Sequence, residues 1–586
     1  MEHEEILTPV RLFRTRLRGE HARNLEAAFG ALLERSGVDP ATNAALVAEI
    51  RRLEALLERL GRLERRWRGA RVALLTVAGV GGAAAALWLA GRLGWAQPLV
   101  AGWVGGVGGA LCAVALTLVF ATVNVRLRSL RAAIADADAE RDARERDAWA
   151  MMEPLNTLFR WDSMAEVTMK TLPILTVDRY LSEERLGQLV RDFGWSGRLG
   201  GKASALVCQS GAVNGNPWVI VELLRQRWQT RTYVGNRLIT WTERGPRGRT
   251  VVRTQLLTAS VERKEPVYAR RKRLVYGNEA APRLTFSRVP NGLAVAGGRD
   301  LERAIEALDE RNRDPDDPFT LLDNPAFDAA FAATDRDDEV QFRLLFTPLA
   351  QQETLALMRD TEVGCGDAFT FVKHGRVNVL ANDLLDALDV SASPRLLRHY
   401  DLRAARRQFL EYGNAFFRGL FFTFAPLFCI PLYQQHRSHA DIYAGIIDAG
   451  APAPLELESL VNALGEARFR PRGADTPSLL TVAVTAQSGA DLRVEVTASA
   501  FHGHRRVAHV SVRGGDGRTH DVSVPWVEYL PVSRTVALGV CPAGTADLDA
   551  FTRGLAAPAW RDRLRALGLG TRPLLFRRGL AAFPAR

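Results

Sequence analysis

Cysteine is scarce in this chain of 586 residues, and its five copies stand far apart. No two of them are spaced as C-x-x-C, so we expect neither a disulfide framework nor a zinc site built on thiolates. The first thirty residues also lack an apolar segment, so no cleavable signal peptide is expected. The cysteines fit a reducing cytoplasm, and they are Cys112, Cys208, Cys365, Cys429 and Cys541.

The chain also lacks the complete motifs of several enzyme classes. Gly201-Lys202 would need a glycine at 196 and a serine or threonine at 203 to form a phosphate-binding loop, but Ser196 and Ala203 stand there. The acidic run 335–339 lacks the central glycine and the closing glutamate of a calcium loop. No catalytic residue is therefore assigned, and no cofactor is expected.

Two long apolar runs without charge, Val72 to Gly91 and Leu99 to Val123, are the strongest signal in the sequence. A helix rises about 1.5 Å per residue, so roughly twenty residues cross a hydrocarbon layer of about 30 Å. We predict a transmembrane hairpin over 72–123, with spans 72–91 and 99–123. The alternative is a pair of core helices in a soluble protein, although such helices usually carry a polar face.

Arginine asymmetry predicts the orientation of this hairpin. Five arginines precede the first run and three follow the second, whereas the connecting loop has only Arg92. Positive charge favours the cytoplasmic side, so both termini are expected in the cytoplasm and the protein in the inner membrane. The net charge of +11 fits contact with the anionic lipids of the bilayer. The flanking arginines are Arg62, Arg65, Arg66, Arg68, Arg71, Arg126, Arg128 and Arg131.

Small residues at four-residue spacing suggest that the two spans touch, because small side chains let helix backbones approach closely. These pairs are Gly102 with Gly106, Gly105 with Gly109, and Gly79 with Ala83.

The flanking segments, 1–71 and 124–150, are predicted to be helical and to extend the hairpin as an antiparallel stalk. Leucine and isoleucine recur at steps of three and four, as in a coiled coil. A homo-oligomer formed through this stalk is a further expectation. Two independent amphipathic helices packed on a soluble domain would explain the pattern equally well. The repeating residues are Leu46, Ile50, Leu53, Leu57, Leu60, Leu127, Leu130, Ile134 and Ala137.

The remainder predicts an α+β cytoplasmic domain over 151–448 and a β-meander domain with a C-terminal helix over 455–586. Expected strands in the first include 218–231, 237–242 and 250–262, with a turn at Gly235-Asn236, and also 339–346. Expected strands in the second are 479–486, 492–500, 506–512 and 519–524, followed by a helix over 547–567. The apolar stretch 415–433 is interrupted by Arg418 and Pro426, so we favour a buried or interfacial segment over a third span.

Two groups of residues are candidates for binding. The densest basic run is Arg270, Arg271, Lys272 and Arg273, which would contact anionic lipid or a partner, or form a solvated face. His502 and His504 share one face of a predicted strand and, with His509, could bind a metal. This ligand set is incomplete, which favours surface histidines.

Several segments resemble a bacterial family of unknown function built on two-pass membrane proteins. The resemblance spans roughly residues 70–435 and implies an apolar hairpin before a cytoplasmic domain. It carries no catalytic residues. The segments are 321–328, 337–349, Trp218, 276–279 and 431–435.

We therefore predict a two-pass membrane protein whose cytoplasmic part binds a protein partner as a scaffold. A membrane-tethered hydrolase or metalloenzyme using the histidine-bearing meander is the alternative. A membrane-anchored nucleic-acid binder is a third hypothesis, which the mixed charge outside the basic run disfavours.

Overall fold

The computed structural model describes residues 6–93, 102–197, 202–244, 250–317, 319–435 and 450–586. It combines helices with antiparallel sheets, which confirms the predicted mixture of the two. The chain divides into two compact units. One holds Met1–Ala28, Arg160–Pro394 and Leu410–Arg586, and the other holds Phe29–Phe159 and Arg395–Phe409.

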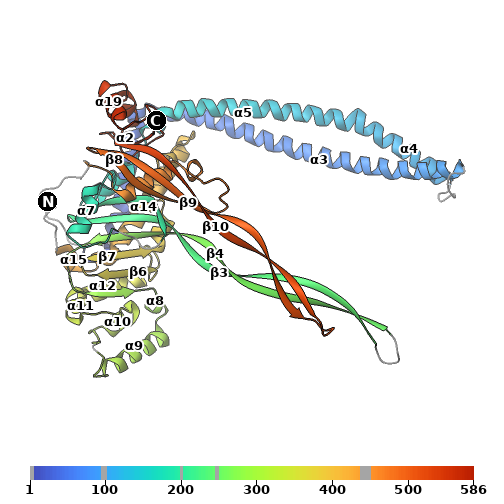
Figure 1. Cartoon of the computed structure of the whole chain (residues 1–586). Coiled ribbons are helices and arrows are strands. Elements are labelled where there is room, and N and C mark those ends of the chain that lie inside the picture. Colours follow the sequence, from blue (N-terminus) through green and yellow to red (C-terminus); the bar gives the residue numbers. More distant parts are fainter. Residues whose placement is uncertain (1–5, 94–101, 198–201, 245–249, 318, 436–449) are drawn as a thin grey trace. The chain divides into compact units, whose positions relative to one another are not determined.

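The smaller unit is dominated by long helices (Figure 1). α3 (Pro40–Arg92) begins where the side chain of Asp39 accepts hydrogen bonds from the N–H groups of Ala41 and Thr42. Asp39 and Pro40 separate α3 from the preceding helix, α2 (Arg18–Ser36). The returning helix consists of α4 (Gly102–Leu118), the π-helical turn η2 (Val119–Val123) and α5 (Asn124–Leu158).

α3 and the returning helix run antiparallel and in contact. Arg131 bonds Glu64 at 2.9 Å, and Arg144 bonds Glu49 at 3.2 Å. Closer to the end of α3 at Arg92, a Cβ atom built on Gly108 would lie 2.8 Å from the carbonyl oxygen of Gly81. The helices therefore cross most closely where both carry glycine.

The glycines at this crossing differ in part from the predicted set. Gly81, Gly105 and Gly108 lie against the opposite helix, whereas Gly79 and Gly106 have nothing within 4 Å of an added Cβ. Four-residue spacing identified the right stretch of helix, but it could not fix which side of that stretch faces the partner.

The larger unit contains a seven-stranded antiparallel sheet in the order β1-β2-β3-β4-β7-β6-β5. Its strands are β1 (Leu175–Val177), β2 (Ala203–Val213), β3 (Asn216–Arg244), β4 (Thr250–Gly277), β5 (Thr285–Arg288), β6 (Phe369–His374) and β7 (Val377–Asn382). Helices of the same unit that precede or interrupt this sheet are α1 (Pro9–Leu12), η1 (Phe13–Leu17), α6 (Ser163–Thr171), α7 (Glu183–Arg191), α8 (Leu293–Ala296), α9 (Gly298–Asn312), α10 (Pro325–Phe331), α11 (Glu339–Leu345), α12 (Pro348–Arg359) and α13 (Asp383–Ala387).

A five-stranded antiparallel sheet follows in the order β11-β12-β10-β9-β8. Its strands are β8 (Leu479–Ser488), β9 (Asp491–Arg513), β10 (Thr519–Pro542), β11 (Leu575–Arg577) and β12 (Leu580–Pro584). The remaining helices are η4 (Pro394–Leu396), α14 (Leu402–Phe428), α15 (Pro431–Gln435), α17 (Pro454–Ala463), η5 (Glu466–Arg468), α18 (Leu548–Gly554) and α19 (Pro558–Ala566).

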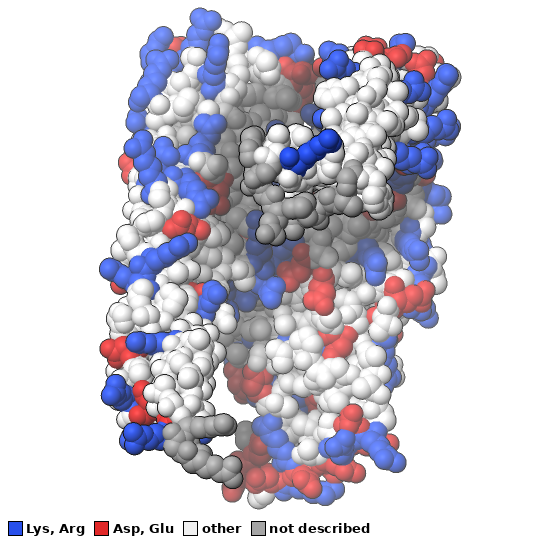
Figure 2. Space-filling view, turned by 90° about the vertical axis from the view of Figure 1, so that its right-hand side faces the viewer, with Lys and Arg blue, Asp and Glu red and all other residues white. Residues whose placement is uncertain are grey.

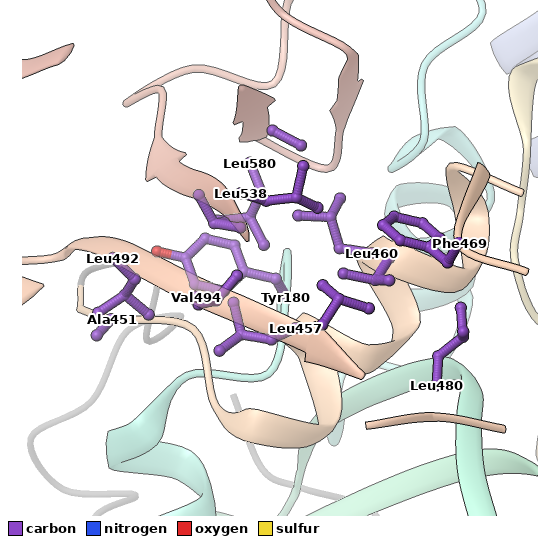
Figure 3. Close-up of a cluster of buried hydrophobic side chains, with 14 of the residues drawn as sticks. Tyr180, Ala451, Leu457, Leu460, Phe469, Leu480, Leu492, Val494, Leu538 and Leu580 are labelled. Carbon is purple, nitrogen blue, oxygen red and sulfur yellow. The ribbon is translucent and has the colours of Figure 1, made fainter. Parts of the chain in front are cut away.

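The helix α17 joins the two sheets into one core. Leu457 and Leu460 pack with Val494 and Leu538 of the five-stranded sheet (Figure 3). On its other side, the carboxylate of Glu458 accepts a hydrogen bond from the N–H of Ala205 in β2 at 2.8 Å. Residues 160–394 and 410–586 thus belong to one compact unit, which differs from the predicted limits at 448 and 455.

The apolar stretch 415–433 lies almost wholly inside the protein. It forms the end of α14 and the start of α15, and Phe417, Phe421 and Phe422 stack around Phe13 of η1. The guanidinium of Arg418 donates to the carbonyl oxygen of Val363 at 2.6 Å. The buried alternative of the sequence prediction is therefore correct for the described residues.

One predicted element has the wrong type, and the limits of two others differ from the prediction. Residues 339–346 form the helix α11 rather than a strand, because Asp338 caps its first turn and every third or fourth side chain is buried. Residues 492–500 and 506–512 form one continuous strand, β9, since its pairing with β10 runs without interruption. The expected helix 547–567 is divided into α18 and α19 by Pro558.

Candidate functional site

Four strands of the larger unit continue far beyond their sheets and form a projecting structure that we call the arm. It comprises residues 226–244 and 250–273 of β3 and β4, and residues 500–537 of β9 and β10 with their connecting turn (Figure 1). β2 pairs with β3 only as far as Arg225, and β8 pairs with β9 only as far as Ser499. Beyond these points each arm strand has one neighbour within its own ribbon among the described residues.

The two ribbons of the arm pack on each other through a small apolar core. Ile239, Leu257 and Ala259 of one ribbon meet Val522 and Val524 of the other, and all five are buried. Burial of aliphatic side chains of this size contributes about 1.5 to 3 kcal/mol each, so the contact holds the ribbons together.

Gly235 marks the closest approach of the ribbons. A Cβ atom at this position would lie 2.2 Å from the carbonyl oxygen of Ser523, so only glycine fits. The predicted turn at Gly235-Asn236 was therefore wrong: β3 passes straight through, with Gly235 paired to Ala259 and Asn236 to Thr258.

Polar contacts fasten the ribbons on either side of this crossing. The guanidinium of Arg237 donates to the carbonyl oxygen of Asp521 at 2.7 Å. The side-chain oxygen of Gln255 accepts from the N–H of Gly515, also at 2.7 Å. Together with the apolar core, these bonds make the arm one four-stranded structure.

The opposite face of the β3–β4 ribbon carries ten uncharged, exposed residues, which we call the outer stripe. Its members form five directly opposed pairs across the ribbon. The four aliphatic members are more than half exposed, with fractions of 66% for Leu238, 64% for Val252, 58% for Leu256 and 54% for Val234. The stripe consists of Val234, Asn236, Leu238, Thr240, Thr242, Val252, Thr254, Leu256, Thr258 and Ser260.

Positive charge is concentrated in the arm. Residues 226–273 and 500–537 contain 18 Lys and Arg against 6 Asp and Glu, whereas the rest of the chain has 59 and 60. The whole formal net charge of +11 thus arises in these two segments. Figure 2 shows Lys and Arg side chains spread over the face in view, with Asp and Glu among them.

Only part of this charge is balanced within the arm. Glu265 bonds Arg231 at 3.0 Å, a contact that raises the pKa of the guanidinium, and Glu528 bonds Arg506 at 2.9 Å. Arg227 and Lys264 are exposed and make no ion pair with a carboxylate of the described residues. The arm therefore presents net positive charge to solvent.

The basic run predicted as a contact site lies at the root of the arm, in β4. Strand alternation separates its members, because Arg271 is exposed whereas Lys272 is buried and donates to the carbonyl oxygen of Asp386 at 2.7 Å. Arg270 and Lys272 both lie within 4.0 Å of Glu222. The run is thus partly structural.

The structure brings two of the three candidate histidines together. The rings of His502 and His504 lie 4.5 Å apart, and His502 bonds Asp475 at 2.8 Å. The N–H of Gly503 and the imidazole of His502 together hold the pKa of Asp475 below its usual range. His509 lies further along β9, beside Ser523. Among the described residues, no group of three His, Cys, Asp or Glu could hold a metal ion.

A cavity of about 120 Å³ lies elsewhere in the larger unit. Two charged side chains that line it, Asp178 and Arg578, already form hydrogen bonds within the protein. Asp178 accepts two hydrogen bonds from Arg185 and one from Ser210. Arg578 donates to Gln209 at 2.5 Å and to three carbonyl oxygens. These bonds account for the groups as parts of the fold. Other residues lining the cavity are Trp161, Asp162, Glu166, Met169 and Arg179.

The chain matches no known family model, no curated protein and no solved structure. The family resemblance therefore stays a prediction.

Proposed function

We propose that the protein is a two-pass inner-membrane protein whose larger unit is an interaction scaffold that presents the arm. The observation that carries this proposal is the exposed apolar surface of the long helices. The most apolar 18-residue windows of α3 and of the returning helix are only 11% and 22% buried. A core helix of a soluble protein would be mostly covered, because exposed aliphatic surface of this extent is costly in water.

The residues that would face lipid are large and exposed on both helices. Val72, Val80, Trp103 and Phe120 are exposed by 63%, 69%, 75% and 69%. Insertion into the hydrocarbon layer would remove this surface from water. The glycines at the crossing let the two helices pack closely against each other. The eight flanking arginines lie next to the ends of the two apolar runs that are opposite Arg92, which supports cytoplasmic termini.

Two observations support the scaffold role. The arm strands have edges without a neighbouring strand in the described residues, and exposed edges of this kind pair readily with an extended segment of another protein. The outer stripe adds four exposed aliphatic side chains next to these edges. Homo-oligomerisation through α3 and α5 remains a prediction.

Membrane insertion is tested with the full chain by alkaline extraction and protease accessibility. We expect the protein to stay with the membrane at high pH. Protease added to intact spheroplasts should leave the larger unit whole, whereas the same protease on inverted vesicles should cut at the arginines of the arm. Extraction by alkali, or cleavage of the arm from outside intact spheroplasts, would reject the proposal.

A further inference from the structure

We propose that the arm is a second, peripheral membrane contact: the outer stripe inserts among the headgroups of an anionic bilayer while the surrounding arginines bind lipid phosphates. This inference deepens the proposed function and rests on it, because the cytoplasmic leaflet supplies the anionic surface. The expected ligand of the outer stripe is therefore a bilayer that contains anionic phospholipid.

The first step is the shape and polarity of the outer stripe. Leu238 and Leu256 oppose each other at its centre, and the hydroxyls of Thr240 and Thr254 lie 3.5 Å apart beside them. The hydroxyl of Thr258 donates to the side chain of Asn236 at 3.0 Å, so several polar groups of the stripe are paired within it, and the stripe carries no charge. Transfer of the aliphatic side chains out of water is favourable, and a surface that is partly apolar and uncharged suits the boundary between headgroups and acyl chains.

The second step is the charge around the stripe. Arg244 follows the Thr242–Val252 pair on the stripe's own face, and Arg253 lies beside the same pair on the other face, where Glu243 bonds it at 2.7 Å. Nearer the root, Arg227 and Lys264 add exposed positive charge. Basic side chains next to an anionic bilayer attract it over a Debye length, about 8 Å at physiological salt.

The same charge disfavours two other occupants. A second copy would bring two arms, each with 16 basic and 6 acidic residues, into contact, and like charges repel. A nucleic acid would satisfy the arginines, but phosphate oxygens and base edges are read by donors rather than by exposed leucine and valine. An anionic bilayer complements both the charge and the apolar face.

The test uses the full chain in lipid nanodiscs, one copy per disc, with Cys112 and Cys365 replaced by alanine and a single cysteine introduced by Leu238→Cys. The cysteine carries an environment-sensitive NBD fluorophore. In discs containing phosphatidylglycerol we expect a blue shift, a rise in intensity, and quenching by lipids that bear a nitroxide on the acyl chain. High salt should weaken all three, since screening shortens the reach of the arginines.

The matched control is Val507→Cys, an aliphatic position of the same arm that is 56% exposed but lies on the other ribbon, facing away from β3 and β4. Its probe should stay in water in every disc. A second variant, Leu256→Asp, should abolish the quenching of the Leu238→Cys probe, whereas Val507→Asp should leave it unchanged.

The outcomes separate this inference from the proposed function. Failure of the chain to assemble into discs would reject membrane insertion itself. Assembly with a Leu238→Cys probe that stays aqueous in both lipid compositions would reject only the lipid contact. A shift that needs two copies per disc, or one that appears with duplex DNA but not with lipid, would also overturn it.

Discussion

His21 is a buried, uncharged histidine in the larger unit. Its Nδ1 lies 3.0 Å from the hydroxyl of Thr171, its Nε2 lies 3.1 Å from the carbonyl oxygen of Gly413, and its ring stacks on Phe417. Burial lowers the pKa of His21 from 6.5 to about 4, against the opposing effect of the Gly413 carbonyl. Protonation would place a charge where the described surroundings offer no carboxylate partner.

The sign of the resulting pH dependence follows from linkage. Between pH 6.5 and 4 the unfolded chain binds the proton that the folded chain excludes, so the free energy of unfolding falls as pH falls through this window. We expect a loss of about 2 to 3 kcal/mol from His21 in the full chain. Urea unfolding in detergent micelles at several pH values measures it.

The variant His21→Gln should be less stable at pH 7 but should lack this component of the pH slope. His374→Gln, which changes an exposed histidine of β6, is the matched control and should keep the slope. Equal slopes in wild type and His21→Gln would contradict the assignment.

At the scale of elements, the contact between α3 and α4 depends on glycine. An added Cβ at Gly108 would lie 2.8 Å from the carbonyl oxygen of Gly81 and 3.1 Å from the Cβ of Ala84. Gly108→Leu should therefore push the helices apart at a cost of about 1 to 3 kcal/mol. Gly106→Leu adds the same side chain on the open side of α4 and should leave the contact intact.

A cysteine cross-link reports on this contact. The Cβ position of Gly82 lies 3.5 Å from the sulfur of Cys112, so Gly82→Cys should form a disulfide with the native cysteine on mild oxidation. Mass spectrometry of proteolytic peptides measures its yield. We expect Gly108→Leu to reduce the yield and Gly106→Leu to preserve it, and the reverse order would show that the helices meet on other faces.

The sequence predicts elements well where a local signal acts alone. Apolar length predicts the span 72–91, which forms part of α3, and the span 99–123, whose described residues fall in α4 and η2. It fails at Gly235, because the reason for glycine is the carbonyl oxygen of Ser523, nearly 300 residues away in the chain. The same applies to the outer stripe, which becomes visible only once β3 is known to be continuous.

At the scale of the whole molecule, α17 couples the two sheets of the larger unit. Leu457 is fully buried in the core of the five-stranded sheet, and the neighbouring Glu458 and Ser459 accept hydrogen bonds from the N–H groups of Ala205 and Cys208 in β2. Ala451, Pro452 and Ala453, just before this helix, are buried and lead into the shared core.

Leu457→Ala should therefore destabilise both sheets. Truncation of a fully buried leucine costs about 2 to 5 kcal/mol, and we expect hydrogen exchange to accelerate in β2 and β3 as well as in β9 and β10. Val340→Ala, at a position 74% exposed, is the control and should alter neither sheet. Faster exchange confined to β9 and β10 would show that the sheets unfold independently.

The strands β3, β4, β9 and β10 pass without a break from the two sheets into the arm, and Gly235 locks the ribbons against each other. A load applied near the far end is consequently transmitted through continuous backbone to the cores on either side of α17, with no hinge in the described strands to absorb it. The arm would act as a stiff lever, so a force applied by a bound surface would reach the cores of the two sheets directly.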